Sequence, residues 1–337
     1  MYHPLITDVE GLKMSANEKA LFNELKPFGF ILFQRNCQSP EQVKNLTDEM
    51  RESVGNEKIP ILIDQEGGRV ARLRPPGWVN YPSAGVYSKL YDADPNLAIT
   101  AVQVHASLMA SKLVEIGVNV DCYPVADLVY EGMSEVVGNR SFGETPVKVT
   151  ALARAASEGM LSCGVTPVMK HLPGHGRAKV DSHLELPIVD TSLEDLIQTD
   201  FAPFKSLNDL PCAMTAHVIY SQIDPEHCAT ISSKIIKEII RDEIGFEGVL
   251  FSDDLGMKAL SHSPVQNALD ALNAGCDLAS HCNGSFEERR QALEATEHLK
   301  IDGQNRLWDY FKARSNLKEI DHDQLYNWLK DVIKYYE

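Results

Sequence analysis

The sequence has no excess of positive charge. Its 48 acidic residues stand against 32 basic ones, which gives a formal net charge of −16. Binding to nucleic acid or to an anionic membrane surface needs a basic patch, so the composition argues against both kinds of partner. The sequence also lacks an apolar run of about 20 residues that could span a bilayer, and its first residues lack the basic and apolar regions of a signal peptide. We therefore expect a soluble, cytoplasmic protein.

A disulfide framework is also missing. The seven cysteines are an odd number, no two of them form a CxxC motif, and most lie inside apolar segments. A secreted, disulfide-stabilised protein would have an even number at regular spacing. We therefore expect buried, reduced thiols and a reducing compartment.

What the sequence does have is a regular alternation of short apolar runs with amphipathic stretches. Hydrophobic residues make up 44% of the 337 residues and charged residues 24%, as in an ordinary globular protein with a large core. Seven apolar runs at this spacing predict parallel strands joined by helical crossovers. The expected strands are residues 29–33, 59–64, 118–125, 165–171, 212–217, 248–254 and 276–280. The expected helices include residues 97–116, 146–161, 233–243 and 265–273, with two more beginning after Ser15 and Ser39.

A polar or charged residue ends nearly every expected strand, for example Asp64, Lys170 and Asp253. An open doubly wound sheet gathers its ligands at one switch point, whereas a closed barrel recruits side chains from the C-terminal ends of many strands. The pattern favours an α/β fold, a (β/α)8 TIM-type barrel that forms a single catalytic domain over residues 1–337. An eighth strand is not apparent, so we expect either an irregular barrel or a further element between residues 77 and 96. Residues 305–337 are expected to form helices packed outside the barrel.

Two motifs contain both arginine and glycine. The first follows the end of an expected strand, and the second is a loop bounded by glycines. In the segment IDQEGGRVAR, Asp64 could accept hydrogen bonds from vicinal hydroxyls and an arginine could donate in a fork, which suits a sugar. Alternatively, Asp64 caps a turn and Arg69 lies on the surface. Glu66 is expected to be structural. Arg140, in the loop GNRSFG, either reaches the barrel mouth or stands in a surface turn.

The richest segment runs from Lys170-His171 through PGHG to Asp181 and His183. A phosphate cradle is poorly supported because the GxxxxGK pattern is absent. A metal site has suitable ligand types but no tight ligand spacing. In a third interpretation, the carboxylate of Asp181 orients the imidazole of His183, which then gives and takes a proton near neutral pH.

The segment FSDDLGM places two adjacent acids at the end of a strand. Because side chains alternate along a strand, one of them should face inward and the other sideways. The inward carboxylate could attack an electrophilic sugar carbon, and the other could cap the following helix. His217 and His281 end two further strands and could line the mouth or stand behind it.

Taken in order, the segments IDQEGGRVARLR, GNRSFGE, MKHLPGHG, DSHLELP, MTAHVIY and LFSDDLGM resemble glycoside hydrolase family three. The match runs from about Leu5 to about Asn283 and is to the compact, one-domain bacterial β-N-acetylhexosaminidases of peptidoglycan recycling. The resemblance implies a retaining enzyme that releases N-acetylglucosamine from its β-1,4 bond to 1,6-anhydro-N-acetylmuramic acid, with or without a peptide. It implies no metal and no organic cofactor.

The resemblance also implies a role for each matching residue. Asp253 corresponds to the nucleophile, His183 to the proton donor and acceptor, and Asp181 to the residue that orients His183. The residues that would hold the terminal sugar are Asp64, Arg72, Arg140, Lys170 and His171. Arg69 has no counterpart in that set. The sequence departs from the common pattern at Asn139, Leu172 and Cys122-Tyr123, which bears on the preference for the aglycone.

Two alternatives remain at the level of the sequence. One is a metal-dependent barrel hydrolase that uses His171, His175, His217 and an aspartate. The other is a sugar-binding protein without catalytic activity. The expected partner is a small amino-sugar or muropeptide substrate, and the expected assembly is a monomer or a weak homodimer.

Overall fold

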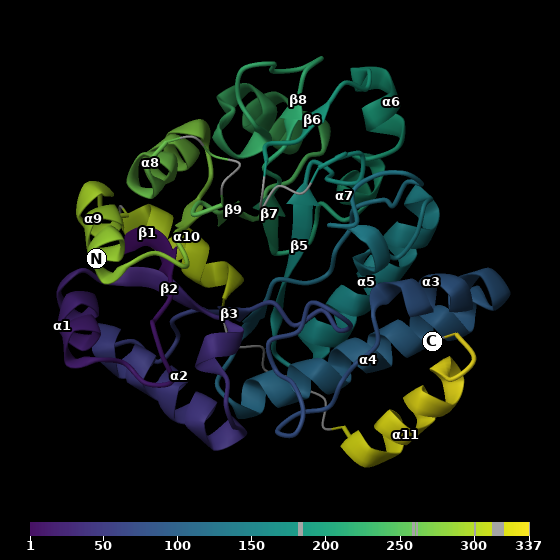
Figure 1. The fold of residues 1–337 in the computed structure, drawn as a ribbon, viewed down its shortest axis with the longest axis horizontal. Helices are drawn as coiled ribbons and strands as arrows, with labels where there is room; N and C mark the ends of the chain where they lie inside the picture. The colour runs from purple at the N-terminus through teal and green to yellow at the C-terminus, as the bar shows by residue number, and fades with distance from the viewer. Residues whose placement is uncertain (181–184, 258–259, 261, 300, 312–319, 337) are drawn as a thin grey trace.

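The computed structural model is a closed barrel of parallel strands surrounded by helices (Figure 1). It describes residues 1–180, 185–257, 260, 262–299, 301–311 and 320–336. Around the barrel the strands follow the order β1-β10-β9-β7-β5-β4-β3-β2. The predicted eight-stranded barrel is therefore confirmed. Its strands are β1 (His3–Thr7), β2 (Pro27–Leu32), β3 (Ile61–Ile63), β4 (Val120–Asp121), β5 (Thr166–Leu172), β7 (Cys212–Thr215), β9 (Val249–Asp254) and β10 (Leu278–Ser280).

Helices follow the strands along the chain and cover the outside of the barrel (Figure 1). Several begin at the expected caps: Ser15 and Glu18 form a capping box, and Ser39 accepts from the backbone N–H of Gln42. The α-helices are α1 (Ala16–Glu24), α2 (Pro40–Val54), α3 (Ala84–Ala93), α4 (Pro95–Glu115), α5 (Pro146–Ser162), α6 (Leu193–Gln198), α7 (Ala202–Ser206), α8 (Pro264–Ala274), α9 (Phe286–Ala295), α10 (Ile301–Tyr310) and α11 (His322–Ile333). Other helical turns are η1 (Gln34–Asn36), η2 (Gly138–Arg140), η3 (Ala229–Ile231) and the longer η4 (Ile235–Glu243).

The eighth strand is β1, near the start of the chain, and the further element that the sequence analysis allowed between residues 77 and 96 is a helix. That stretch forms α3, whose buried residues Ala84, Tyr87 and Leu90 recur at helical spacing. β1 is short and carries a histidine and a proline, so its sequence has no strong strand pattern, yet all five of its residues are buried. The strand expected at residues 118–125 shrinks to β4, and the small parallel sheet of β6 (Ile188–Val189) and β8 (Ile219–Tyr220) was not expected.

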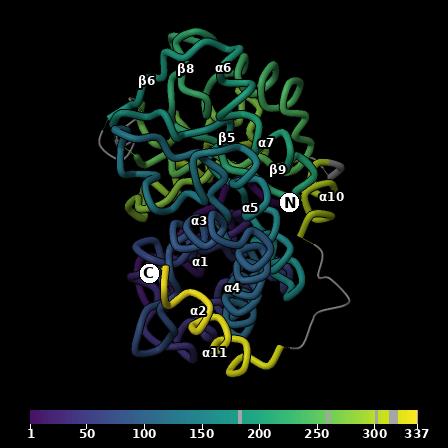
Figure 2. The backbone as a smooth tube through the Cα atoms, turned by 90° about the vertical axis from the view of Figure 1, so that its right-hand side faces the viewer, coloured from purple at the N-terminus to yellow at the C-terminus, as the bar shows by residue number. Residues whose placement is uncertain are grey.

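The interior of the barrel is apolar and is closed at the N-terminal end of the strands by α10. Phe28 of β2 stacks on Trp308 with ring centroids 4.4 Å apart, and Phe251 meets Phe311 edge-on at 6.3 Å. α11 runs along the outside of the molecule and packs against α4 (Figure 2). The C-terminal ends of the strands are therefore the end at which polar side chains can gather around a cavity.

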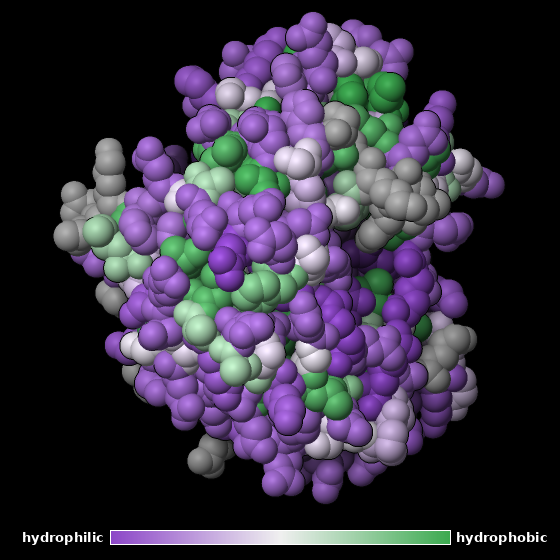
Figure 3. All heavy atoms as spheres, turned by 60° about the vertical axis from the view of Figure 1, so that its left-hand side comes forward, coloured by the Kyte–Doolittle hydropathy of each residue, from purple (hydrophilic) through white to green (hydrophobic). Residues whose placement is uncertain are grey.

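By length and composition α4 could cross a membrane, but half of its apolar window is buried inside the protein. It packs against α3, α5 and α11, as a core helix does. The face shown in Figure 3 is mostly hydrophilic, with hydrophobic residues in small separate groups. All seven cysteines are free, and all but the half-buried Cys37 are buried, which confirms the prediction of buried thiols without disulfides.

Candidate active site

The C-terminal ends of the strands surround a cavity of about 360 Å³. Six residues singled out in the sequence line it together, although they are spread over nearly 200 positions of the chain: Asp64, Arg72, Arg140, Lys170, His171 and Asp253. Arg140 does reach the mouth rather than standing in a surface turn. Parallel strands end at the same edge of a barrel, which is why distant motifs converge here.

Asp64, directly after β3, is held by two cations. Its Oδ1 accepts from Lys170 Nζ at 2.8 Å, and its Oδ2 accepts from Arg72 Nη2 at 3.0 Å. Burial opposes the charged form of this carboxyl, but Lys170 and Arg72 outweigh burial and hold the pKa of Asp64 well below its usual range. The cavity therefore contains an ionised acceptor beside two donors, a set that suits a sugar with neighbouring hydroxyls.

Glu66 is buried and does not line the cavity, but it contacts two of the residues that do. It accepts from Arg140 Nε at 2.8 Å and from Arg140 Nη2 at 2.7 Å, and Lys170 Nζ lies 2.7 Å from its Oε1. Burial opposes its ionisation, but the cations lower the pKa of Glu66 to about 2. Conversely, Asp64 and Glu66 outweigh burial and raise the pKa of Lys170 above its usual range. Glu66 thus fixes two cavity-lining cations, in agreement with the structural role expected for it.

His171 is oriented by a carboxylate that the sequence analysis did not assign to the site. His171 Nδ1 lies 2.7 Å from Oδ2 of the fully buried Asp127. Asp127 also accepts from the backbone N–H of His175 at 2.7 Å. Burial opposes ionisation of Asp127, but His171 outweighs it and lowers the pKa of this carboxyl. Because an ionised carboxylate only accepts, Nδ1 of His171 carries the proton of this bond.

Asp253 and Asp254 both line the cavity, but they are held differently. Asp254 Oδ1 accepts from the backbone N–H groups of Gly256 at 3.0 Å and Cys282 at 3.2 Å. Its Oδ2 accepts from Asn283 Nδ2 at 2.9 Å. Burial, together with the charge of Asp253, raises the pKa of Asp254 to about 6. The backbone N–H of Asp254 donates in turn to Oδ1 of Asp253 at 2.8 Å. Asp254 therefore binds the turn after β9. The expectation that one of the two acids faces away from the cavity and caps the following helix was wrong, because both acids line the cavity and Ser263 is the N-cap of α8.

Three histidines near the strand ends do not line the cavity: His175, His217 and His281. His217 lies between Thr230 Oγ1 at 2.7 Å and the carbonyl oxygen of Asp254 at 3.0 Å, and neither His217 nor His281 lines the cavity. Burial lowers the pKa of His175 to about 4. Among the residues that the structure describes, no three His, Cys, Asp or Glu side chains are grouped to hold a metal ion. Asp181 and His183 lie outside the described residues.

Several lining residues had no site role assigned from the sequence. Arg69, which the family resemblance leaves without a role, lines the cavity and donates from Nη2 to the carbonyl oxygen of Val136 at 2.7 Å. Phe33 follows β2, and the guanidinium groups of Arg35 and Arg72 lie 4.6 and 5.6 Å from its ring centroid. The remaining wall is mostly apolar, and no sequence pattern separates such residues from the core: Ile31, Val70, Val136, Met214, Met257 and Cys282.

Comparison with known proteins identifies the family. Residues 5–306 match the N-terminal domain of glycosyl hydrolase family 3. The chain belongs to this family. A β-hexosaminidase of Alkalilimnicola ehrlichii is 43% identical over 284 residues, which cover 83% of this chain and 80% of that protein. A β-hexosaminidase of Haemophilus influenzae is 35% identical over 332 residues, which cover 96% and 90%.

The fold of this family 3 member is also found among solved structures. NagZ from Neisseria gonorrhoeae, crystallised in complex with N-trifluoroacetyl-D-glucosamine, superimposes with a TM-score of 0.85 at 31% identity. The superposition covers 99% of this chain and 97% of that one. The resemblance deduced from the motifs is therefore confirmed. The chain is a glycoside hydrolase of the compact bacterial β-N-acetylhexosaminidase type, with β-N-acetylglucosaminidase activity.

Proposed function

We propose that this enzyme removes terminal N-acetylglucosamine from 1,6-anhydro-N-acetylmuramic acid, with or without a peptide, during cell-wall recycling in the cytoplasm. The observation that carries the proposal is that the Asp253 carboxylate and the Asp64–Lys170–Arg72 clamp line one cavity. The clamp suits the hydroxyls of one sugar, and a carboxylate on the same cavity can reach the anomeric carbon of that sugar. The volume of about 360 Å³ lies near the lower end of the range of roughly 300–1,000 Å³ for small-ligand sites. A pocket of this size favours release of one terminal unit.

In the first step, an oxygen of Asp253 attacks the anomeric carbon of the bound sugar. The bond from that carbon to the leaving oxygen breaks, and His183 donates a proton to this oxygen as Asp181 stabilises the imidazole. The aglycone leaves as a neutral alcohol, and the sugar remains attached to Asp253 as an ester. Most retaining glycosidases use a second carboxyl group for the proton transfer, whereas here a histidine–aspartate pair takes that role.

In the second step, the neutral imidazole of His183 takes a proton from a water molecule as the water oxygen attacks the same carbon. The ester bond breaks, and Asp253 leaves as a carboxylate. Two displacements at one carbon retain the β configuration. A neutral imidazole adds no negative charge beside Asp253, whereas a carboxylate in the position of the proton donor would add one.

The test is hydrolysis of p-nitrophenyl N-acetyl-β-glucosaminide with and without EDTA. Asp253→Asn should lower kcat by roughly 10⁴-fold or more, the scale seen when a catalytic side chain is removed. His183→Ala should lower it by about 10²–10⁴-fold. Two surface variants, Asp48→Asn and His227→Ala, are the matched controls, because both side chains are exposed and lie outside the cavity lining.

The aglycone is tested with N-acetylglucosamine linked to 1,6-anhydro-N-acetylmuramic acid as the substrate. The proposal predicts free N-acetylglucosamine, with the β anomer appearing first in the proton NMR spectrum. Release of the α anomer first, or activity that EDTA abolishes, would overturn the mechanism. Activity on the synthetic glycoside alone would overturn the proposed substrate and leave the reaction type intact.

A further inference from the structure

Asn283 lies three residues after the end of β10 and lines the cavity, in a conformation that few residues other than glycine adopt. Its φ is 59°, in the left-handed region, and its side chain is part of the cavity lining. Asparagine tolerates this region better than most residues with a side chain. The sequence motifs and the family resemblance assign no role to Asn283.

The amide of Asn283 joins two charged side chains from different strand ends. Its Nδ2 donates to Asp254 Oδ2 at 2.9 Å, and its Oδ1 accepts from Arg35 Nη1 at 2.7 Å. The backbone N–H of Asp254 donates in turn to Oδ1 of Asp253 at 2.8 Å. One residue, Asp254, therefore connects the Asn283 amide to the proposed nucleophile through two hydrogen bonds.

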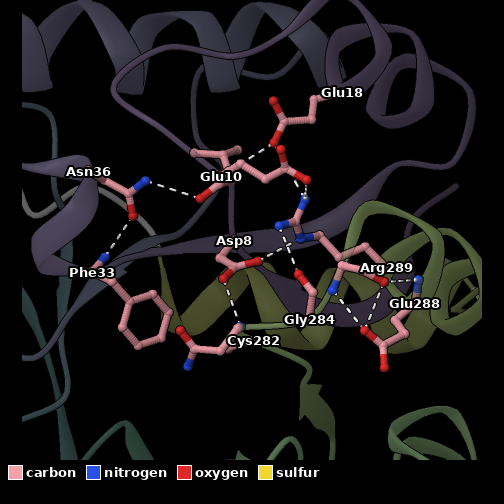
Figure 4. Close-up of polar contacts among 12 residues, drawn as sticks. Asp8, Glu10, Glu18, Phe33, Asn36, Cys282, Gly284, Glu288 and Arg289 are labelled. Atoms are coloured by element: carbon pink, nitrogen blue, oxygen red, sulfur yellow. Dashed lines mark hydrogen bonds and ion pairs between the residues drawn. The ribbon is translucent and has the colours of Figure 1, made fainter.

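The backbone of Asn283 is itself anchored in a buried ion-pair network. Figure 4 shows three members of this network, Asp8, Glu18 and Arg289. Its N–H donates to Asp8 Oδ2 at 2.8 Å, and Arg289 Nε donates to Asp8 Oδ1 at 2.8 Å. Asp8 is fully buried and Arg289 is 2% exposed. Arg289 Nη1 lies 3.5 Å from Glu18 Oε1, and Arg35 forms a second ion pair with Asp8. Such buried pairs hold their geometry because breaking one leaves an uncompensated charge.

These contacts form one continuous path across three neighbouring strands of the barrel. It runs from Arg289 on α9 to Asp8 after β1, then to Asn283 after β10, and then to Asp254 and Asp253 at the end of β9. β1, β10 and β9 are adjacent in the barrel. The path therefore fixes the end of β9 against its neighbours at the place where the proposed nucleophile stands.

We propose that Asn283 is a positioning residue for Asp253, acting through Asp254. The inference rests on the proposed function, in which Asp253 attacks the sugar. The Asn283 amide donates to Asp254 and so favours its ionised form, which keeps the Asp254 carboxylate on the backbone of the turn. With that carboxylate in place, the Asp254 N–H stays directed at Asp253 and fixes the rotation of the nucleophilic carboxylate. An attack trajectory depends on such alignment.

Two substitutions at Asn283 separate positioning from packing. Asn283→Gly removes the amide but permits the positive φ and keeps the backbone N–H that binds Asp8. Asn283→Asp keeps the shape and the acceptor for Arg35, but it replaces the donor to Asp254 with a second negative charge. The proposal predicts that kcat on p-nitrophenyl N-acetyl-β-glucosaminide falls roughly tenfold in Asn283→Gly and further in Asn283→Asp, with KM nearly unchanged in both.

The relative kcat values of the two variants distinguish positioning from packing. If Asn283→Asp keeps the wild-type kcat and only Asn283→Gly loses it, the side chain serves packing and the proposal is wrong. A rise in KM at constant kcat would show that Asn283 binds the substrate directly, which would also overturn it. Asn56→Gly is the matched control, because Asn56 makes two side-chain hydrogen bonds far from the cavity, to Tyr2 and Lys58.

Asp253→Asn is measured beside them, so that failure of the proposed function can be distinguished from failure of this inference. Activity retained in Asp253→Asn would overturn the proposed function. If Asp253→Asn is inactive but both Asn283 variants keep the wild-type kcat, the proposed function stands and the positioning role falls.

Discussion

Replacing Glu66 tests the cluster of ion pairs that holds the charged residues of the cavity wall. Two carboxylates, Asp64 and Glu66, face three cations, Arg72, Arg140 and Lys170, through hydrogen bonds and ion pairs of 2.7 to 3.0 Å. Glu66→Gln keeps the volume and removes one of the two negative charges. Arg140 then has no carboxylate bound to both Nε and Nη2, and Lys170 retains Asp64 as its carboxylate partner.

The expected loss of stability follows from the burial of these groups. The side chains of Arg140, Glu66 and Lys170 are 9, 4 and 2% exposed. Breaking a pair this deeply buried costs about 3–5 kcal/mol. At about 2.1 cal/mol/K per residue, the unfolding entropy of 337 residues is about 0.7 kcal/mol/K, so Tm should fall by about 4–7 °C. KM should rise about tenfold as Arg140 and Lys170 lose their shared anchor, while kcat should change less because Asp253 is held from β9.

The assay is differential scanning calorimetry combined with initial rates on p-nitrophenyl N-acetyl-β-glucosaminide. Glu243→Gln is the control, because Glu243 pairs with Lys205 at 2.8 Å and the two side chains are 35% and 54% exposed. A pair near the surface contributes about 0–1 kcal/mol, so this variant should melt within about 1.5 °C of the wild type. If Glu66→Gln matched the control in both Tm and KM, the cluster would not hold the cavity as we describe.

Three further predictions concern the same cluster and its neighbour Asp127. Lys170→Met should raise KM by about 100-fold, because Asp64 and Glu66 both lose a charged donor; steady-state kinetics with an unchanged KM would contradict this. Asp127→Asn should lower kcat/KM roughly tenfold by releasing His171 from its acceptor, and a wild-type value would show that His171 needs no orientation. The pKa of Glu66 is lowered from 4.5 to about 2, so its carboxylate stabilises the folded state above about pH 5 and loses this effect as the pH falls toward 2. Urea unfolding at pH 7, 4 and 2.5 should therefore show a shallower decline in Glu66→Gln than in the wild type, and parallel curves would refute the assignment.

The barrel could be predicted because its strands differ clearly from their surroundings. Apolar runs such as residues 59–64 and 248–254 are bounded by polar residues, and their spacing leaves room for one crossover helix each. β1 lacked this contrast, since five residues with a histidine and a proline carry little pattern. Its identity as a strand depends on pairing with β2 and β10, contacts between segments more than 270 residues apart in the case of β10.

For the site, the residues at strand ends could be predicted and their partners could not. Asp64, Lys170 and Asp253 each follow or end an apolar run, so their place at the barrel mouth follows from the fold. The pairing of Glu66 with Arg140 joins residues 74 positions apart, and that of His171 with Asp127 joins residues 44 apart. Such pairs depend on strand register and loop path, which no local pattern encodes.

The covalent mechanism is tested most directly by finding which residue carries the sugar during turnover. A 5-fluoro-β-N-acetylglucosaminyl fluoride has a good leaving group and an electronegative substituent that slows hydrolysis of the intermediate, so the covalent species should accumulate. Intact-protein mass spectrometry and peptide mapping then locate the label. The proposed mechanism predicts one sugar per chain, attached to Asp253 within the segment FSDDLGM. A label on Asp254 or on any other residue, or active enzyme that never becomes labelled, would contradict it.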